Sequence, residues 1–296
     1  MDIFLIVDIL KLAGMYILMS LGFVVIYKAS HVLNLAQPGS VMLASFIGLQ
    51  VLPQNFDNPT SFGKLSLTLA LMIVGGIILG LVVYRYFIQP LSGTSRISIV
   101  LMTLAALFLL EAVVDFIWPG ESGFMALPGT SIGFKLSDTI YIRLFDLLPP
   151  VVGLVVWLAL LLFYRLSRQG IRVQAVAENS SLAARRGINI NHIGAVSWAI
   201  AVVVGVIAGM AIGTQSVVST LIVGTALKGF TVALVGGLDS IEGIVPAALL
   251  IAALEVATVR WIDQQWSEAV PFIVLLVVLM IKPWGLFGRT EELERV

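Results

Sequence analysis

The chain has 296 residues, of which 59% are hydrophobic and 11% are charged, with 17 basic and 17 acidic side chains. Soluble domains carry about a quarter of their residues as charge, so this composition excludes an ordinary soluble protein and predicts a membrane protein. The balanced charge gives no field for nucleic acid, and the absence of cysteine excludes disulfides and thiolate sites.

Long apolar segments divide the chain into about eight or nine expected transmembrane helices. A helix needs about 20 apolar residues to cross the hydrocarbon, because its backbone polar groups must be satisfied within the segment. An all-α, polytopic bundle is therefore predicted, as a single domain over residues 1–296. Two spans are short and contain glycine, which favours broken or re-entrant helices. The spans are 9–27, 38–52 (short), 65–87, 97–117, 148–165, 193–213, 221–236 (short), 244–259 and 268–282.

Two segments need a separate interpretation. The chain starts without a basic leader or a small-residue cleavage site, so the first apolar segment is interpreted as a retained helix. The longest connection, 118–147, is rich in proline and glycine and is predicted to be an ordered outer loop or a short helix.

Basic side chains gather on one side of this topology. With nine spans, eleven of the 17 share a side with the C-terminus, five lie opposite, and Lys228 falls within a span. Cytoplasmic loops are enriched in Lys and Arg, so the C-terminus is predicted to be cytoplasmic and the N-terminus external. The eleven are Lys28, Arg85, Arg96, Arg165, Arg168, Arg172, Arg185, Arg186, Lys282, Arg289 and Arg295; the five are Lys11, Lys64, Lys135, Arg143 and Arg260.

The most polar stretch is residues 165–191, on the predicted cytoplasmic side. Helical spacing of its apolar residues, Arg185 and Arg186 near the end and a terminating Gly187 predict a short amphipathic helix over 173–187. An equally valid alternative is a solvated loop that carries positive-inside charge. The small residues that would let another protein approach the helix backbone are Ala175, Ala177, Ala183 and Ala184.

Small residues recur at four-residue intervals in several spans. This spacing lets helices pack backbone to backbone where lipid gives no hydrophobic driving force, so a tight bundle is predicted. Receptors, channels and membrane enzymes use the same packing, which therefore identifies no function. The positions are Gly76 and Gly80; Ala201, Gly205, Gly209 and Gly213; and Gly229, Ala233 and Gly237, with Gly236 and Gly237 forming a turn.

Three ionisable side chains fall inside the predicted spans, where a charge costs at least about 2.5 kcal/mol. Glu111 and Glu255 lie toward the outer ends of their spans and are expected to be interfacial anchors. Lys228 is expected either to line a polar cavity or bind freed carbonyl groups, or to extend to the membrane interface. The candidates for a substrate pathway are Asn34, Gln37, Thr103 and Lys228.

Signatures of other functions are absent from the sequence. There is no G-x-x-x-x-G-K-[ST] loop, so the chain is not expected to bind ATP itself. No dinucleotide fingerprint or G-x-S-x-G elbow indicates redox or hydrolytic chemistry, and no catalytic residue is assigned. His31 and His192 are far apart and lack an H-E-x-x-H context, so no metal site and no cofactor are predicted.

Four motifs follow one another along the chain, and their combination in this order is more specific for a family than any single motif. They are Asn34-Leu35-Ala36-Gln37-Pro38-Gly39 with Met42 to Phe46; Ala175-x-Ala177-Glu178-Asn179 with Ala183-Ala184-x-x-Gly187-Ile188-Asn189; Leu227 to Gly243; and Pro283-x-Gly285-Leu286-Phe287-Gly288-Arg289. Together they resemble the permeases of branched-chain amino acid ABC importers, the Liv type. The second motif is similar to the cytoplasmic coupling segment of that family.

The resemblance implies a type II ABC importer fold and a transport subunit that is not an enzyme. The chain would form half of a pathway with a second homologous permease, as a heterodimer, in a bacterial plasma (inner) membrane. Two cytoplasmic ABC ATPases would hydrolyse ATP, and an external binding protein would deliver branched-chain or related hydrophobic amino acids, urea, amides or small acids. The implied ATPase-coupling residues are Ala175, Ala177, Glu178, Asn179, Ala183, Ala184, Arg185 and Gly187.

The chain departs from the family pattern at two places. Pro38 adds a residue to the first motif, which leaves the start of the second helix open. Asp239 and Glu242 make one loop acidic, either to pair with a partner's basic residues or to be solvated. Two other classes of function remain open: a stand-alone secondary transporter or channel for a small neutral solute, and a membrane enzyme. Inverted repeats would favour the first, and the scarcity of polar residues disfavours the second.

Overall fold

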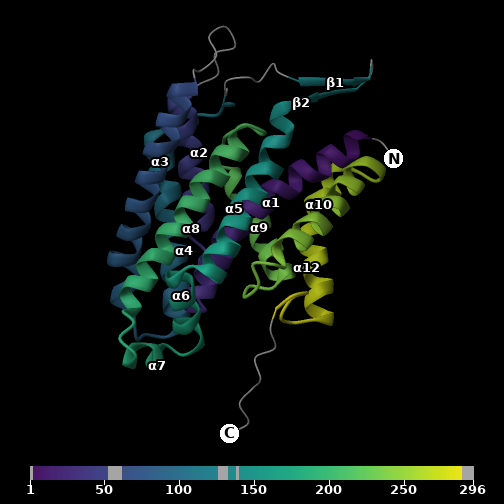
Figure 1. The fold of residues 1–296 in the computed structure, drawn as a ribbon. Helices are drawn as coiled ribbons and strands as arrows, with labels where there is room; N and C mark the ends of the chain where they lie inside the picture. The colour runs from purple at the N-terminus through teal and green to yellow at the C-terminus, as the bar shows by residue number, and fades with distance from the viewer. Residues whose placement is uncertain (1–2, 53–61, 126–132, 138–139, 289–296) are drawn as a thin grey trace.

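A computed structural model describes residues 3–52, 62–125, 133–137 and 140–288 (Figure 1). Parts of the predicted outer loop, and Arg289 and Arg295, lie outside the described residues. The elements are α1 (Ile3–Ser30), α2 (Gln37–Val51), α3 (Phe62–Val83), α4 (Arg96–Ile117), β1 (Gly133–Ser137), β2 (Ile140–Arg143), α5 (Leu148–Leu166), α6 (Arg168–Glu178), α7 (Ser180–Arg185), α8 (Ile190–Gly213), α9 (Ile222–Gly236), α10 (Ile244–Trp261), α11 (Gln264–Ser267) and α12 (Val270–Ile281). A π-helical turn (Tyr84–Ile88) and a 3-10 turn (Gln89–Leu91) extend α3, and another 3-10 turn (Leu144–Leu147) precedes α5.

Six of the described helical segments are long and apolar enough to cross a membrane. They contain α1, α3, α4, α5, α8 and α10. The helices α9 and α12 are also apolar but shorter. These eight segments match eight of the nine expected spans, and α2 occupies the ninth. The prediction of an all-α, polytopic bundle is confirmed.

The two spans that were predicted to be short, 38–52 and 221–236, are continuous helices in the structure. The helices α2 and α9 are each continuous over 15 residues, which is about 22 Å against a hydrocarbon core of about 30 Å. The helix α2 is buried along most of its length and packs against α4, α8 and α9. Protein covers it, so its length need not match the bilayer.

Proline marks the start of α2, α5 and α12. In the first turn of a helix, a proline removes only an N–H group that has no intrahelical partner. Pro38 lies in that turn of α2, which begins at Gln37. The extra residue in the motif is therefore accommodated as a helix start.

The centre of the bundle is formed by α1 and α8, which pack against each other. The helices α3, α4 and α5 lie outside them and present large apolar side chains outward; Phe116 and Leu166, for example, are 87% and 75% exposed. A surface of this kind is stable against lipid and not against water. The chain is a multi-pass membrane protein.

The two ends of the bundle carry different structures (Figure 1). One end, here the hairpin end, carries β1 and β2, which pair antiparallel with Gly133 opposite Arg143. The other, here the α7 end, carries α6 and α7. Part of the 118–147 connection is thus a β-hairpin, which differs from the expected loop or short helix.

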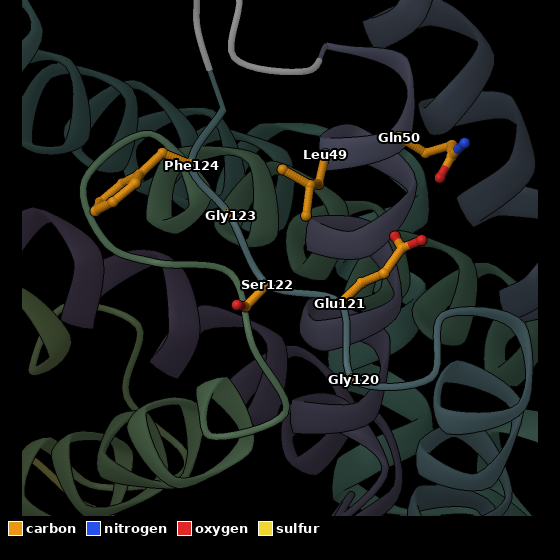
Figure 2. Close-up of a pocket in the computed structure, with 7 residues that line it drawn as sticks. All are labelled: Leu49, Gln50, Gly120, Glu121, Ser122, Gly123 and Phe124. Atoms are coloured by element: carbon orange, nitrogen blue, oxygen red, sulfur yellow. The ribbon is translucent and has the colours of Figure 1, made fainter.

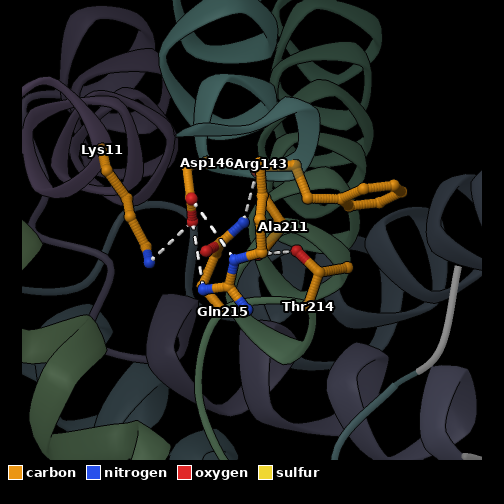
Figure 3. A network of polar contacts seen from close by, with 7 residues as sticks. Lys11, Arg143, Asp146, Ala211, Thr214 and Gln215 are labelled. Carbon is orange, nitrogen blue, oxygen red and sulfur yellow. Dashed lines mark hydrogen bonds and ion pairs between the residues drawn. The ribbon is translucent and has the colours of Figure 1, made fainter. Parts of the chain in front are cut away.

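A polar network holds the hairpin end to the bundle (Figure 3). Lys11 Nζ of α1 lies 3.2 Å from Asp146 Oδ1, and Arg143 Nε lies 3.4 Å from Asp146 Oδ2. Gln215 Nε2, in the α8–α9 connection, donates to the Phe145 carbonyl oxygen at 2.6 Å. The hairpin is therefore tied to α1 and to the end of α8.

Glycines lie where helices approach one another closely. A Cβ atom on Gly80 of α3 would lie 2.7 Å from Ala199 Cα of α8, and one on Gly76 would lie 3.0 Å from Val206 Cγ2. The glycines of α8 at 205, 209 and 213 face Ser40, the Val41 carbonyl oxygen and Met125. Gly236 and Gly237 face Gly243 and Gly288, and Gly237 has a φ of +99°.

Gly80→Ala is expected to destabilise the chain by about 1–3 kcal/mol, because a methyl group would push α3 away from the backbone of α8. Gly75→Ala is the matched control: a Cβ atom there meets nothing within 4 Å. That variant should be as stable as the parent or slightly more stable, since alanine favours helix. Thermal unfolding in detergent compares the two, and equal melting temperatures would contradict the close packing of α3 on α8.

Candidate functional site

The predicted coupling segment is two helices in the structure, where one helix over 173–187 was expected. Ser167 caps α6 by accepting a hydrogen bond from the Gly170 N–H. Asn179 ends α6 in an extended conformation and caps α7 by accepting from the Leu182 N–H at 2.9 Å. Asparagine competes for backbone N–H groups in this way, which breaks a helix and starts a new one.

The C-terminal end of α7 is capped by Gly187, as the sequence predicts. Gly187 has a φ of +81°, its N–H donates to the Ala184 carbonyl oxygen at 2.9 Å, and the Ile188 N–H donates to that of Ala183 at 3.1 Å. Glycine adopts this left-handed conformation without the strain that a side chain brings.

The two helices bury one side and expose the other. Val173, Val176 and Ala183 are buried, and Ala175 and Ala177 are partly buried, so the four alanines do not form one exposed stripe as expected. Leu182 is 51% exposed. The other predicted coupling residues, all of them exposed, are Glu178, Asn179, Ala184, Arg185 and Gly187.

His31 joins this segment to the end of α1. Its Nε2 donates to the Ala177 carbonyl oxygen at 3.2 Å, and its Nδ1 lies 3.9 Å from Asp239 Oδ1 in the α9–α10 connection. Lys28 Nζ donates to the Asp239 carbonyl oxygen at 3.0 Å and lies 5.7 Å from the centroid of the Tyr164 ring. His31 holds a φ of 51°, which is uncommon for a residue with a side chain.

Both acids of the α9–α10 connection have partners within the chain. Asp239 faces His31, and Glu242 forms an ion pair with Arg165 at the end of α5. The sequence predicted that these acids meet a partner protein or solvent. It did not indicate the two contacts within the chain, because each contact joins segments far apart in the sequence. The end of α9, just before this connection, meets the C-terminal motif: the Leu286 and Phe287 N–H groups donate to the carbonyl oxygens of Val235 and Gly236 at 2.8 and 3.2 Å.

Three of the predicted pathway residues come together at the start of α2. Asn34, Gln37 and Thr103 are all buried. Asn34 Oδ1 accepts from the Ala36 N–H at 3.1 Å, and Gln37 Nε2 donates to the Ala201 carbonyl oxygen at 3.1 Å. Thr103 Oγ1 accepts from the Leu35 N–H at 3.0 Å. These bonds fix the turn between α1 and α2 against α4 and α8.

Thr103→Val is expected to destabilise the chain by about 1–3 kcal/mol, because it leaves the Leu35 N–H without its acceptor inside the bundle. Thr103→Ser keeps the hydroxyl group and should retain most of the stability. Thermal unfolding of both variants in detergent measures the difference. A valine variant as stable as the serine variant would show that this hydrogen bond contributes little.

Lys228, the fourth pathway candidate, belongs to a separate cluster. Its Nζ lies 2.8 Å from Glu255 Oε1 of α10 and 3.0 Å from Oε2 of Glu268, which lies between α11 and α12. Tyr16 of α1 donates a hydrogen bond to Glu255 Oε2. The interfacial role expected for Glu255 is therefore wrong: this carboxylate is 6% exposed, because Lys228 and Tyr16 satisfy it within the bundle. Glu111 is partly buried on α4.

The hairpin end carries a pocket of about 620 Å³ (Figure 2). It lies between the end of α2 and the segment that follows α4, and its polar side chains are Gln50, Glu121 and Ser122. Gln50 Oε1 accepts from Trp118 Nε1 at 2.9 Å, which fixes that wall. Among the described residues, no group of three or more His, Asp and Glu side chains is placed to hold a metal ion.

Comparison with known proteins adds an independent observation. A family model described as "Branched-chain amino acid transport system / permease component" matches residues 5–279. The chain is 25% identical to the high-affinity branched-chain amino acid transport system permease protein LivH of Salmonella typhimurium, over 95% of this chain and 93% of the relative.

Two further relatives have the same extent. LivH of Escherichia coli K12 is 24% identical, and the permease protein BraD of Pseudomonas aeruginosa is 28% identical, each over 95% of this chain and over 93% and 94% of the relative. No solved structure matches the chain. The chain belongs to the family of branched-chain amino acid transport system permease components.

Proposed function

We propose that the chain is the membrane subunit of an ABC importer for branched-chain or other hydrophobic amino acids. It forms half of the translocation pathway, beside a second homologous permease in a heterodimer. Two cytoplasmic ATPases bind the α7 end, and an external binding protein delivers the solute to the hairpin end. The chain itself forms the translocation pathway and changes conformation during transport, while ATP hydrolysis takes place on the partners.

The observation that carries this proposal is the exposed α6–α7 segment. Both helices lie at one end of the bundle (Figure 1), and each has an exposed face that another protein can contact. At the same time, His31 binds the Ala177 carbonyl oxygen, and Gln174 Nε2 donates to that of Tyr164 at 3.0 Å. A force applied to α6 therefore reaches the ends of α1 and α5 directly.

Charge supports the orientation. The α7 end includes the basic residues of α6 and α7 and Arg165 at the end of α5, whereas Lys11 and Arg143 lie at the hairpin end. By the positive-inside rule, this distribution supports an α7 end in the cytoplasm of a bacterial cell, with the start of α1 outside. ATPases, which are cytoplasmic, would meet α6 and α7 there.

The competing class is a transporter or channel that works alone. Purification of the tagged chain from native membranes, followed by reconstitution, separates the two classes. The proposal expects ATPase subunits to co-purify and leucine uptake to require ATP and the binding protein. Uptake by the chain alone, driven by an ion gradient, would refute the importer assignment.

A further inference from the structure

The Lys228 cluster contains one fixed and one exchangeable ion pair. Glu255 is 8% exposed at its side chain, lies 2.8 Å from Lys228 Nζ and is also held by Tyr16. Glu268 Oε2 lies 3.0 Å from Lys228 Nζ, but the Glu268 side chain is 75% exposed. Because water competes with an exposed ion pair, Glu268 can release Lys228 at little cost, whereas Glu255 cannot.

The cluster carries more carboxylates than cations. Glu255 alone neutralises Lys228, so Glu268 is a second carboxylate beside a side chain that is already paired. Lys228 and Glu255 are the only charged side chains that are buried among the described residues. Ionisable groups at this depth are costly, and they commonly mark a solute path.

Open space lies over the helix surface one turn before Lys228. Gly224 precedes Lys228 by one helical turn on the same face of α9, and a Cβ atom there would meet nothing within 4 Å. The long side chains of a helix lean toward its N-terminus, so the Lys228 stem runs toward this turn. An aliphatic group could therefore lie over Gly224 while its polar end reaches Lys228.

We propose that Lys228, Glu268 and the space over Gly224 form a binding site for a zwitterionic aliphatic amino acid. The solute carboxylate replaces Glu268 on Lys228 Nζ, and the solute ammonium group binds the released Glu268 carboxylate. Each charge then keeps an opposite partner, so a zwitterion enters without adding net charge to the bundle. The aliphatic side chain lies over Gly224.

This site deepens the proposed function and rests on it, because it selects among the solutes that such a permease would carry. Urea and neutral amides have no charges to exchange with the Lys228–Glu268 pair. A simple carboxylate can bind Lys228 but leaves Glu268 without a cation. The chemistry of the site therefore favours amino acids with free α-amino and α-carboxyl groups over these other small solutes.

Binding of radiolabelled L-leucine to the purified permease–ATPase complex, without the binding protein, tests the site. Glu268→Gln is expected to weaken leucine binding at least tenfold with an unchanged melting temperature, since the side chain is exposed. Glu242→Gln is the matched control, because Glu242 is also an exposed, ion-paired glutamate but lies at the α7 end; it should bind leucine normally. Gly224→Leu should weaken binding by filling the space.

A competitor adds a readout that a purely structural role would not change. 4-Methylpentanoate has the carboxylate and side chain of leucine without the ammonium group. The parent complex should prefer leucine strongly, and Glu268→Gln should bind the two compounds about equally. Unchanged leucine affinity or unchanged preference in Glu268→Gln would overturn the site, as would the absence of leucine binding by a complex that transports leucine. A parent chain that assembles with no ATPase and takes up no leucine would refute the proposed function, and the site with it.

Discussion

Leu182→Arg is expected to abolish ATP-dependent uptake and the co-purification of ATPases, while the chain still inserts and folds. Leu182 is 51% exposed on α7, so folding should tolerate an arginine there. Loss of one side chain that is central to a protein interface costs about 2 kcal/mol, which corresponds to about 30-fold in affinity. A buried charge without a partner would add to that loss.

Ile190→Arg is the matched control for this variant. Ile190 is also an exposed apolar residue at the α7 end, at 38%, but it lies at the start of α8, outside the two helices. It should leave ATPase association and uptake close to the parent values. Full uptake by Leu182→Arg would contradict the role proposed for α7, and equal losses in both variants would show that the whole end is the contact.

The sequence predicts the membrane helices well because their signal is local. About 20 consecutive apolar residues have few alternatives to a membrane helix, and eight of the spans appear as the longer or shorter apolar helices of the structure. The position of α2 could not be predicted in the same way. Its apolar composition fits a lipid-facing helix equally well, and only its contacts with α4, α8 and α9 show that protein covers it.

The break at Asn179 had a local signal that was missed. Asn179-Ser180-Ser181 is a favourable helix start, yet the apolar spacing from Val173 onward favoured one continuous helix. The cap shows that a side chain competing for N–H groups outweighs periodicity over so short a segment. The meeting of Thr103 with Leu35 had no such signal, because it depends on how α4 packs against the turn before α2.

The Lys228–Glu255 pair had a partial signal in the sequence, weaker than that of the break at Asn179 but stronger than that of the Thr103 contact. Two ionisable residues of opposite charge in consecutive apolar spans can be expected to pair, because each alone would be costly in hydrocarbon. Taken singly, a glutamate near the end of a span indicates the interface, whereas Lys228 satisfies Glu255 inside the bundle. Tyr16 of α1 and Glu268, between α11 and α12, complete the cluster, and no sequence spacing indicates them.

Lys228→Met is expected to destabilise the chain by about 3–5 kcal/mol, because it leaves the buried Glu255 carboxylate without a cation. For a chain of this size, that loss corresponds to a fall in melting temperature of about 10 °C. Thermal unfolding of the purified variant in detergent measures it. Glu268 remains in this variant, but as a second carboxylate it cannot neutralise Glu255.

The double variant Lys228→Met with Glu255→Gln separates loss of the pair from loss of packing. Glutamine still accepts the Tyr16 hydrogen bond and carries no charge, so the double variant should recover most of the stability lost in Lys228→Met. It should nevertheless bind no leucine, because the proposed site has lost its cation. A double variant as unstable as Lys228→Met would mean that the lysine stem, and not its charge, holds α9 against α10.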